Sequence, residues 1–216
     1  MASPIAGRLL QHALAKPLLF VVALGPFAYL VWAVFADALG PNPAEALIRA
    51  SGDWTLRFLC ITLAVTPLRQ LTGQGQLLRF RRMLGLFTFF YGLVHVLCYS
   101  GFDMAFDLGD IVRDIIKRPF ILAGFTALML MAPLAATSFN RAIRVMGAAR
   151  WQLLHRLVYV VAVVALLHFW WMRAAKHNFA EPAIYIVIIS VLMAWRLWHR
   201  RRGAQASRMQ PAARNA

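Results

Sequence analysis

Charged residues are scarce in this chain, and acidic ones are the scarcest. Of 216 residues only 14% are charged, with 8 Asp or Glu against 23 Lys or Arg. A soluble domain carries about 25% charged residues, so this composition does not fit an ordinary soluble domain. Hydrophobic residues make up 61% of the chain and the mean hydropathy is +0.63, which predicts a membrane protein.

Several sequence motifs are also missing. The two cysteines, Cys60 and Cys98, both lie in apolar runs and form no C-x-x-C pair, so the sequence indicates no zinc site, no thioredoxin-like motif and no covalent c-type haem attachment. No G-x-G-x-x-G fingerprint of a dinucleotide-binding domain occurs. The sequence therefore shows no dinucleotide-binding domain.

The net charge is +15, which on a soluble protein would suggest nucleic-acid binding. Here the basic residues cluster between apolar runs, and retention of Lys and Arg on the cytoplasmic side of a membrane explains that pattern. The expected partner is thus the lipid bilayer, and no nucleic acid is expected.

Six apolar runs predict membrane helices. They cover residues 17–36, 54–68, 83–100, 119–136, 151–172 and 182–198. The first has about 20 residues, enough for ~30 Å of hydrocarbon, and is longer than the apolar part of a signal peptide, the alternative for this segment. Pro41, Pro43 and Gly52 predict a loop before the second run, and residues 69–82 and 137–150 predict basic loops.

The basic residues also predict the topology. With the N-terminus inside, the inner segments carry fifteen Lys or Arg and the outer segments six. This bias predicts an all-α six-helix transmembrane bundle with both termini cytoplasmic. The acidic segment 101–118 lies outside in this topology and has near-helical spacing, so it predicts a surface-lying helix, with docking of a partner as the alternative role.

Histidines in the apolar runs are the candidate functional residues, because an ionisable ring is costly to bury in lipid. His95 lies ~18 Å into its helix and His168 ~25 Å into another that runs in the same direction, so the two rings could meet in the outer half of the membrane. Two imidazoles suit the axial positions of a six-coordinate haem that transfers electrons. The alternative is that each histidine only hydrogen-bonds a neighbouring helix.

The third histidine, His155, precedes His168 by 13 residues, so it lies ~20 Å lower and ~140° around the helix. At that level the 83–100 helix offers Arg81 and Arg82 instead of a histidine, and a second haem there would need another ligand. Near the upper site, Arg57 either snorkels to the interface or pairs with a haem propionate, as Arg118 could.

The ordered motifs of residues 50–170 resemble those of the MsrQ family, formerly called YedZ. They are Thr66-Pro67-Leu68, Arg82-Met83-Leu84-Gly85-Leu86, Tyr91 with His95, Lys117-Arg118-Pro119-Phe120, Thr137-Ser138, Trp151 with Leu154-His155-Arg156-Leu157-Val158-Tyr159, and His168. This family is the haem-binding membrane subunit of the bacterial periplasmic protein-methionine-sulfoxide reductase system. It belongs with the ferric-reductase-like transmembrane domains of the NADPH oxidases.

The resemblance implies a function in the bacterial cell inner membrane. Haem b would pass electrons from the quinone pool or a cytoplasmic flavin reductase to a periplasmic molybdopterin subunit that repairs oxidised periplasmic proteins. It also implies an FMN cofactor, and it matches His95, His155 and His168 to the family's haem-associated histidines. The basic segment Arg79–Arg82 and Trp151 are the candidate flavin contacts.

In this interpretation residues 1–16 form a cytoplasmic lead, 17–198 the ferric-reductase-like six-helix haem domain and 199–216 a basic cytoplasmic tail. The chain would be the electron-transfer subunit of an oxidoreductase system and not its catalytic subunit. Two alternatives remain: a stand-alone transmembrane ferric or quinone reductase, and a haem-free transporter or assembly factor whose histidines relay protons.

Overall fold

The computed structural model describes residues 4–174 and 178–209, and every regular element in that part of the chain is helical. The helices are α1 (Pro4–Gln11), α2 (Ala15–Phe35), α3 (Pro43–Thr72), η1 (Gly75–Leu77), α4 (Leu78–Cys98), the π-helical turn η2 (Tyr99–Asp103), α5 (Leu108–Lys117), α6 (Pro119–Ala136), α7 (Asn140–Met146), α8 (Ala148–His155), α9 (Leu157–Ala174) and α10 (Ala180–Met209). The all-α prediction is therefore confirmed for the described residues.

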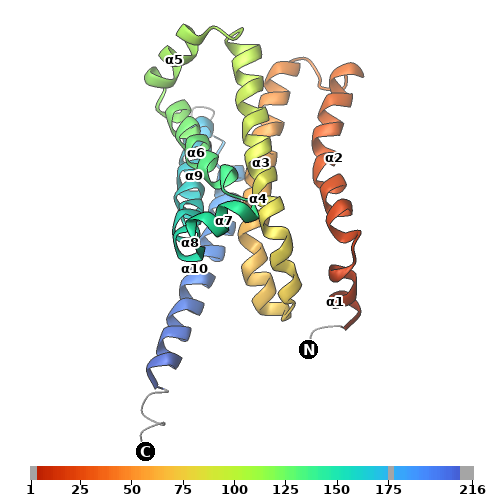
Figure 1. The fold of residues 1–216 in the computed structure, drawn as a ribbon. Helices are drawn as coiled ribbons and strands as arrows, with labels where there is room; N and C mark the ends of the chain where they lie inside the picture. Colours follow the sequence, from red (N-terminus) through yellow and green to blue (C-terminus); the bar gives the residue numbers. More distant parts are fainter. Residues whose placement is uncertain (1–3, 175–177, 210–216) are drawn as a thin grey trace, which may run out of the picture.

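Helix α3 is the centre of the bundle. It runs beside α4 over its length, with α2 on one side and α6, α9 and α10 on the other (Figure 1). One hydrophobic cluster joins α3 to α2 and α4 through residues such as Phe58 and Phe87. A second cluster joins α3 to α6, α9 and α10 through residues such as Leu59 and Val161. The two faces of α3 thus hold the two halves of the bundle together.

Five helical segments of the described chain are long and apolar enough to cross a membrane. They are Ala15–Phe35, Gly75–Asp103, Pro119–Ala136, Ala148–Ala174 and Ala180–Arg202. Helix α3, the predicted second crossing, is not among them, and its apolar stretch is interrupted by Arg57 and bounded by Arg69. Large apolar side chains are exposed along these helices, as expected where lipid is the solvent.

The three predicted loops are wrong. The basic segment 69–82 is mostly helical, since it contains the end of α3, η1 and the start of α4. Gly52 does not end a helix but lies inside α3, which begins at Pro43 with Asn42 as its N-cap; the Asn42 side chain accepts a hydrogen bond from the Glu45 amide at 3.2 Å. Proline is well placed at the first helical position because its missing N–H has no partner there in any case. The basic segment 137–150 is also mostly helical, forming α7 and the start of α8.

The other helix boundaries differ less from the predicted ones. The single predicted helix 151–172 is divided at Arg156 into α8 and α9, and the sixth helix continues as α10 to Met209, into the predicted tail. Residues 210–216 of that tail lie outside the described part. The acidic segment contains a helix as predicted, α5, which begins after Asp107 as its N-cap and has no fully buried residue.

The hydroxyl of Tyr91 on α4 forms hydrogen bonds to the backbone of α2 beside the internal proline of that helix, Pro26. This hydroxyl donates to the Ala23 carbonyl at 2.8 Å and accepts from the Phe27 amide at 3.0 Å. These two backbone groups are four residues apart and would pair with each other in a regular helix. Tyr91 is fully buried and stacks on Phe58 with ring centroids 5.1 Å apart, so α2 is joined to the α3–α4 pair by a polar bridge within an aromatic cluster.

We predict that Tyr91→Phe lowers the free energy of unfolding by about 1–2 kcal/mol, because it leaves a buried carbonyl and amide without the bridging hydroxyl. Unfolding of the purified chain in detergent, followed by circular dichroism, measures this. Tyr29→Phe is the matched control, since Tyr29 lies on α2 and is 58% exposed. Equal stability of the two variants would contradict the prediction.

Candidate functional site

The rings of His95 on α4 and His168 on α9 face each other. Their centroids are 6.2 Å apart and their planes are inclined by 74°. Both rings lie in the interior of the bundle, between helix pairs that pack closely: α3 with α4, and α6 with α9. The predicted meeting of these two rings at one level is therefore observed, although they are 73 residues apart in the chain.

Each ring is held by the same arrangement on the neighbouring helix. His95 Nδ1 lies 2.8 Å from the Ile48 carbonyl of α3, and a Cβ added at Gly52 would lie 3.2 Å from the His95 ring. Four residues separate the carbonyl from the glycine. We call this pair of groups an imidazole seat, made of a backbone carbonyl and a glycine one helical turn later.

The second seat repeats the first on α6. His168 Nδ1 lies 2.6 Å from the Phe120 carbonyl, and a Cβ added at Gly124 would lie only 2.8 Å from the His168 ring. A real Cβ at that distance would force the ring to move, so glycine is required for this packing. Helices α3 and α6 thus hold the rings of His95 and His168 in equivalent ways.

The seats fix which ring nitrogen is free. A carbonyl oxygen can only accept, so Nδ1 carries the proton in both rings and donates it to Ile48 or Phe120. The lone pair of each neutral ring is then on Nε2. A histidine that binds a metal typically donates its other ring N–H to a carbonyl or carboxylate in this way, which orients the ring and raises its basicity.

The spacing of the two rings also fits a shared metal. Two metal–imidazole bonds of about 2 Å each, together with the two ring radii, place the ring centroids about 6 Å apart. Among the described residues, no group of three or more His, Cys, Asp or Glu side chains gathers around one point. The pair can therefore supply two axial ligands to a metal whose other ligands come from elsewhere, as in haem, and it is not a complete metal site by itself.

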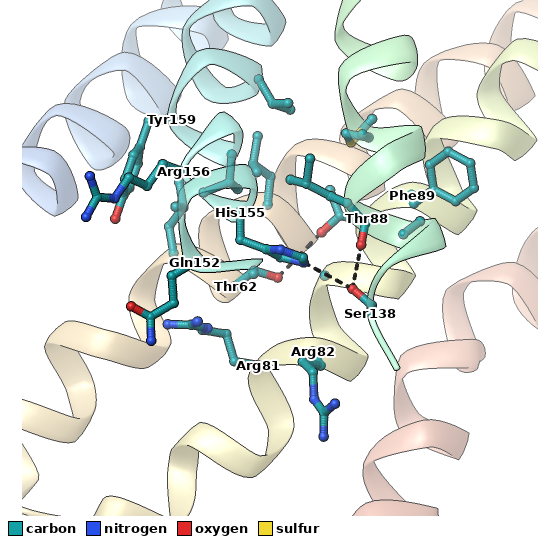
Figure 2. Close-up of a pocket in the computed structure, with 18 of the residues that line it drawn as sticks. Thr62, Arg81, Arg82, Thr88, Phe89, Ser138, Gln152, His155, Arg156 and Tyr159 are labelled. Atoms are coloured by element: carbon teal, nitrogen blue, oxygen red, sulfur yellow. Dashed lines mark hydrogen bonds between the residues drawn. The ribbon is translucent and has the colours of Figure 1, made fainter. Parts of the chain in front are cut away.

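His155 lies apart from this pair. Its ring stacks on Trp151 with centroids 3.8 Å apart, and its Nδ1 lies 3.0 Å from the Trp151 carbonyl of its own helix. Its Nε2 is 3.5 Å from the Ser138 hydroxyl (Figure 2). His155 therefore has no seat on a neighbouring helix, although its Nδ1 also bonds a carbonyl.

A cavity of about 340 Å³ adjoins His155 where α3, α4, α6, α8, α9 and α10 meet (Figure 2). Its wall contains Trp151 and Tyr159 and five arginines: Arg81, Arg82, Arg156, Arg196 and Arg200. The candidate flavin contacts Arg81, Arg82 and Trp151 thus lie in one cavity wall, whereas Arg79 turns away and donates to the Leu10 and Gln11 carbonyls. The arginines of α10 were not predicted, because the run Arg200–Arg202 has the same composition as a stop signal.

The arginines predicted for the upper site have partners of their own. The guanidinium of Arg57 is exposed and lies 4.6 Å from the Trp54 ring centroid, and Arg118 forms an ion pair with Asp114 at 2.8 Å. The sequence interpretation overlooked Arg173, which is only 7% exposed, pairs with Glu181 and lies over Phe169. Its position five residues after His168 was the only signal in the sequence.

These contacts define a class of protein: a helical membrane bundle in which two histidine rings are each held by a carbonyl and a glycine of a neighbouring helix. Residues 51–166 match the family model described as the ferric reductase like transmembrane component. Together with the five apolar helices, this match makes the chain a multi-pass membrane protein with a ferric-reductase-like transmembrane domain.

Curated relatives narrow the assignment. A protein from Polaromonas naphthalenivorans is 62% identical over 92% of this chain and 92% of its own length; one from Ralstonia nicotianae is 53% identical over 86% of each chain; one from Herminiimonas arsenicoxydans is 49% identical over 88% and 89%. Each is named protein-methionine-sulfoxide reductase heme-binding subunit MsrQ. The chain belongs to the MsrQ family. No solved structure matches it.

We predict that Gly124→Ala destabilises the chain, because the new Cβ would lie 2.8 Å from the His168 ring. Overpacking of this kind costs about 1–3 kcal/mol and exceeds the gain of about 1 kcal/mol from a better helix former. Gly85→Ala in α4 is the control, since its Cβ would make only an ordinary contact with Thr62 at 3.7 Å. Thermal unfolding in detergent measures the stability of both variants. A stabilised Gly124→Ala variant would contradict the prediction, because it would show that there is space for a Cβ beside the His168 ring.

Proposed function

We propose that this chain is a haem b electron-transfer subunit of a protein-methionine-sulfoxide reductase. The observation that carries the proposal is the pair of seated imidazoles, His95 and His168, whose Nε2 lone pairs are kept free at a spacing that suits one metal between them. The names of the curated relatives support the same assignment.

Haem, when bound, supplies a one-electron carrier. His95 and His168 would hold this group through their Nε2 atoms, and two imidazole ligands from the protein would favour electron transfer over oxygen activation. The surrounding helices are apolar, and the carbonyls of Ile48 and Phe120 hold the proton of each ring on Nδ1, so that Nε2 is the nitrogen available to a metal.

We base the proposed direction of electron flow on membership of the MsrQ family. We propose a donor in the quinone pool or a cytoplasmic flavin reductase, FMN as a further cofactor, and a periplasmic molybdopterin subunit as the acceptor that reduces methionine sulfoxide in oxidised periplasmic proteins. The membrane would be the bacterial inner membrane. In this proposal the chain transfers electrons, and the periplasmic subunit catalyses the reduction.

The proposed topology has six crossings, with both termini cytoplasmic and residues 17–198 as the haem domain. Three features support it. Helix α3 runs the length of its neighbour α4, and α1 lies at the same end of the bundle as the last turns of α10 (Figure 1). All eight Asp and Glu residues belong to segments at the other end, which would then face the periplasm.

Two further residues retain proposed roles. His155 is a candidate ligand for a group bound in the arginine-lined cavity, but it is the only histidine among the described residues of that wall, so a second bis-imidazole haem has no partner for it there. Arg57 is a candidate propionate partner through a change of rotamer away from Trp54.

We predict that His95→Ala and His168→Ala each abolish most haem binding, because either change removes one of the two axial ligands. A pyridine haemochrome assay gives haem per chain, and electron paramagnetic resonance reports the low-spin signal of a bis-imidazole iron. His12→Ala is the control, since His12 lies on the N-terminal segment. Unchanged haem content in both variants would remove the assignment.

We also predict that the positions after α1 and after α10 both lie in the cytoplasm, which reporter proteins fused at these positions test. A green fluorescent protein fusion should fluoresce and an alkaline phosphatase fusion should be inactive at these two sites. The same pair fused within the α5 segment should give the reverse result. Opposite sides for α1 and the end of α10 would exclude an even number of crossings.

A further inference from the structure

Segment 99–118 joins the helix that carries His95 to the helix that holds the His168 ring. It contains η2 and α5, and α5 lies at the end of the bundle between the end of α4 and the start of α6 (Figure 1). In the bundle α5 packs mainly on α6, and it has no fully buried residue. Burial of side chains therefore fixes the position of α5 only weakly, and polar contacts are the main constraint on where it lies.

The side chain of Asp114 on α5 supplies these polar contacts. Its Oδ2 accepts a hydrogen bond from the Tyr99 hydroxyl at 2.7 Å, and its Oδ1 accepts one from Arg118 Nε at 2.8 Å. The Asp114 side chain is only 12% exposed. A carboxylate beside a guanidinium makes charge-assisted hydrogen bonds, which are shorter and stronger than neutral ones. Asp114 thus links Tyr99 firmly to Arg118.

Tyr99 connects this link to His95. It lies four residues after His95 at the end of α4, and its amide donates to the His95 carbonyl. The two side chains are therefore one helical turn apart on the same face of the helix. The π-helical turn η2 begins at Tyr99 itself. Because a helix moves as a rigid unit over one turn, the position of the Tyr99 hydroxyl also constrains the position of the His95 ring.

Arg118 connects the same link to His168. Arg118 is the N-cap residue of α6 and precedes Phe120, whose carbonyl accepts from His168 Nδ1, by two residues. Its backbone is extended, with φ −111° and ψ 104°, as expected for a residue before proline. The Arg118 amide also donates to the Asp114 carbonyl at 3.0 Å. Asp114 therefore fixes both the side chain and the backbone from which the first turn of α6 starts.

We propose that Asp114 is a positioning residue for the haem site. By holding Tyr99 and Arg118, it sets the spacing and the inclination of the two histidine rings, whose centroids are 6.2 Å apart and whose planes are inclined by 74°. We rest this on the haem-binding function proposed above, and it concerns the geometry of the axial ligands and not their identity. Residues beyond the ligands commonly tune metal affinity and reduction potential in this way.

The experiment compares Asp114→Ala and Tyr99→Phe with the unmodified chain, each purified with haem in neutral detergent. Electron paramagnetic resonance records the low-spin ferric signal, whose g values depend on the angle between the two imidazole planes. A redox titration gives the midpoint potential, and transfer of haem to apomyoglobin gives the rate of haem loss. We expect both variants to shift the low-spin signal and the potential and to lose haem about tenfold faster, at the lower end of what loss of an outer-shell partner costs.

Asp110→Ala is the matched control. Asp110 lies one turn earlier on α5, its side chain is 59% exposed, and it pairs with Arg113 of the same helix. This variant should leave the signal, the potential and the rate of haem loss unchanged. The double variant Tyr99→Phe/Asp114→Ala should change little beyond Asp114→Ala, since the Tyr99 hydrogen bond is already lost there. Tyr99→Phe removes only one hydroxyl and keeps the test decisive should Asp114→Ala fail to fold.

A purely structural role of Asp114 predicts a different result. Asp114→Ala and Tyr99→Phe would then unfold at a lower temperature and keep the signal, the potential and the rate of haem loss of the unmodified chain. That outcome overturns the proposal. An equal change of the signal in Asp110→Ala overturns it as well.

A measurement on the haem-free chain separates this inference from the proposed function. Without haem, Asp114→Ala should increase hydrogen–deuterium exchange in peptides that cover residues 118–124, the start of α6, whereas Asp110→Ala should not. Unchanged exchange in Asp114→Ala would overturn the positioning role whether or not the chain binds haem. Absence of haem from the unmodified chain would instead contradict the proposed function and leave the exchange result valid.

Discussion

The structure depends on one constraint: an imidazole buried in an apolar bundle needs a hydrogen-bond partner for one nitrogen and room for its ring. Leaving a polar N–H unpaired in hydrocarbon costs several kcal/mol. Here the Ile48 and Phe120 carbonyls satisfy Nδ1 of His95 and His168, and Gly52 and Gly124 make room for the rings. The same contact that stabilises each part-buried ring also holds the ring proton on Nδ1 and leaves Nε2 without one.

Because both seats are built on helices, they require α3 to pack closely on α4 and α6 to pack closely on α9. Those are the two most extensive helix pairs of the bundle. The central position of α3 then brings the two pairs together, since one of its faces packs in each hydrophobic cluster. The approach of the two rings is thus a consequence of how two helix pairs are joined, and Tyr91 adds α2 to one of them.

The predictions that succeeded used properties that every residue of a segment shares. Apolar length located five of the six predicted membrane helices, and a rise of ~1.5 Å per residue placed His95 and His168 at nearby levels. The failures concerned single residues. Gly52 was interpreted as a loop marker because glycine is a poor helix former, but it lies in α3 where a histidine ring needs the space. The segment 137–150 was interpreted as a loop because its charges mask the helices α7 and α8.

The sequence by itself determined that this is a helical membrane protein and that two histidines of its apolar runs lie at comparable depth. These properties follow from composition and helix geometry, which act along the chain. Only the tertiary structure decided which carbonyls hold the histidines, that His155 stays apart from them, and that arginines from α4 and α10 share a cavity. Those facts depend on the rotation and contact of helices distant in the chain, which hydrophobic periodicity does not specify when lipid surrounds an almost uniformly apolar helix.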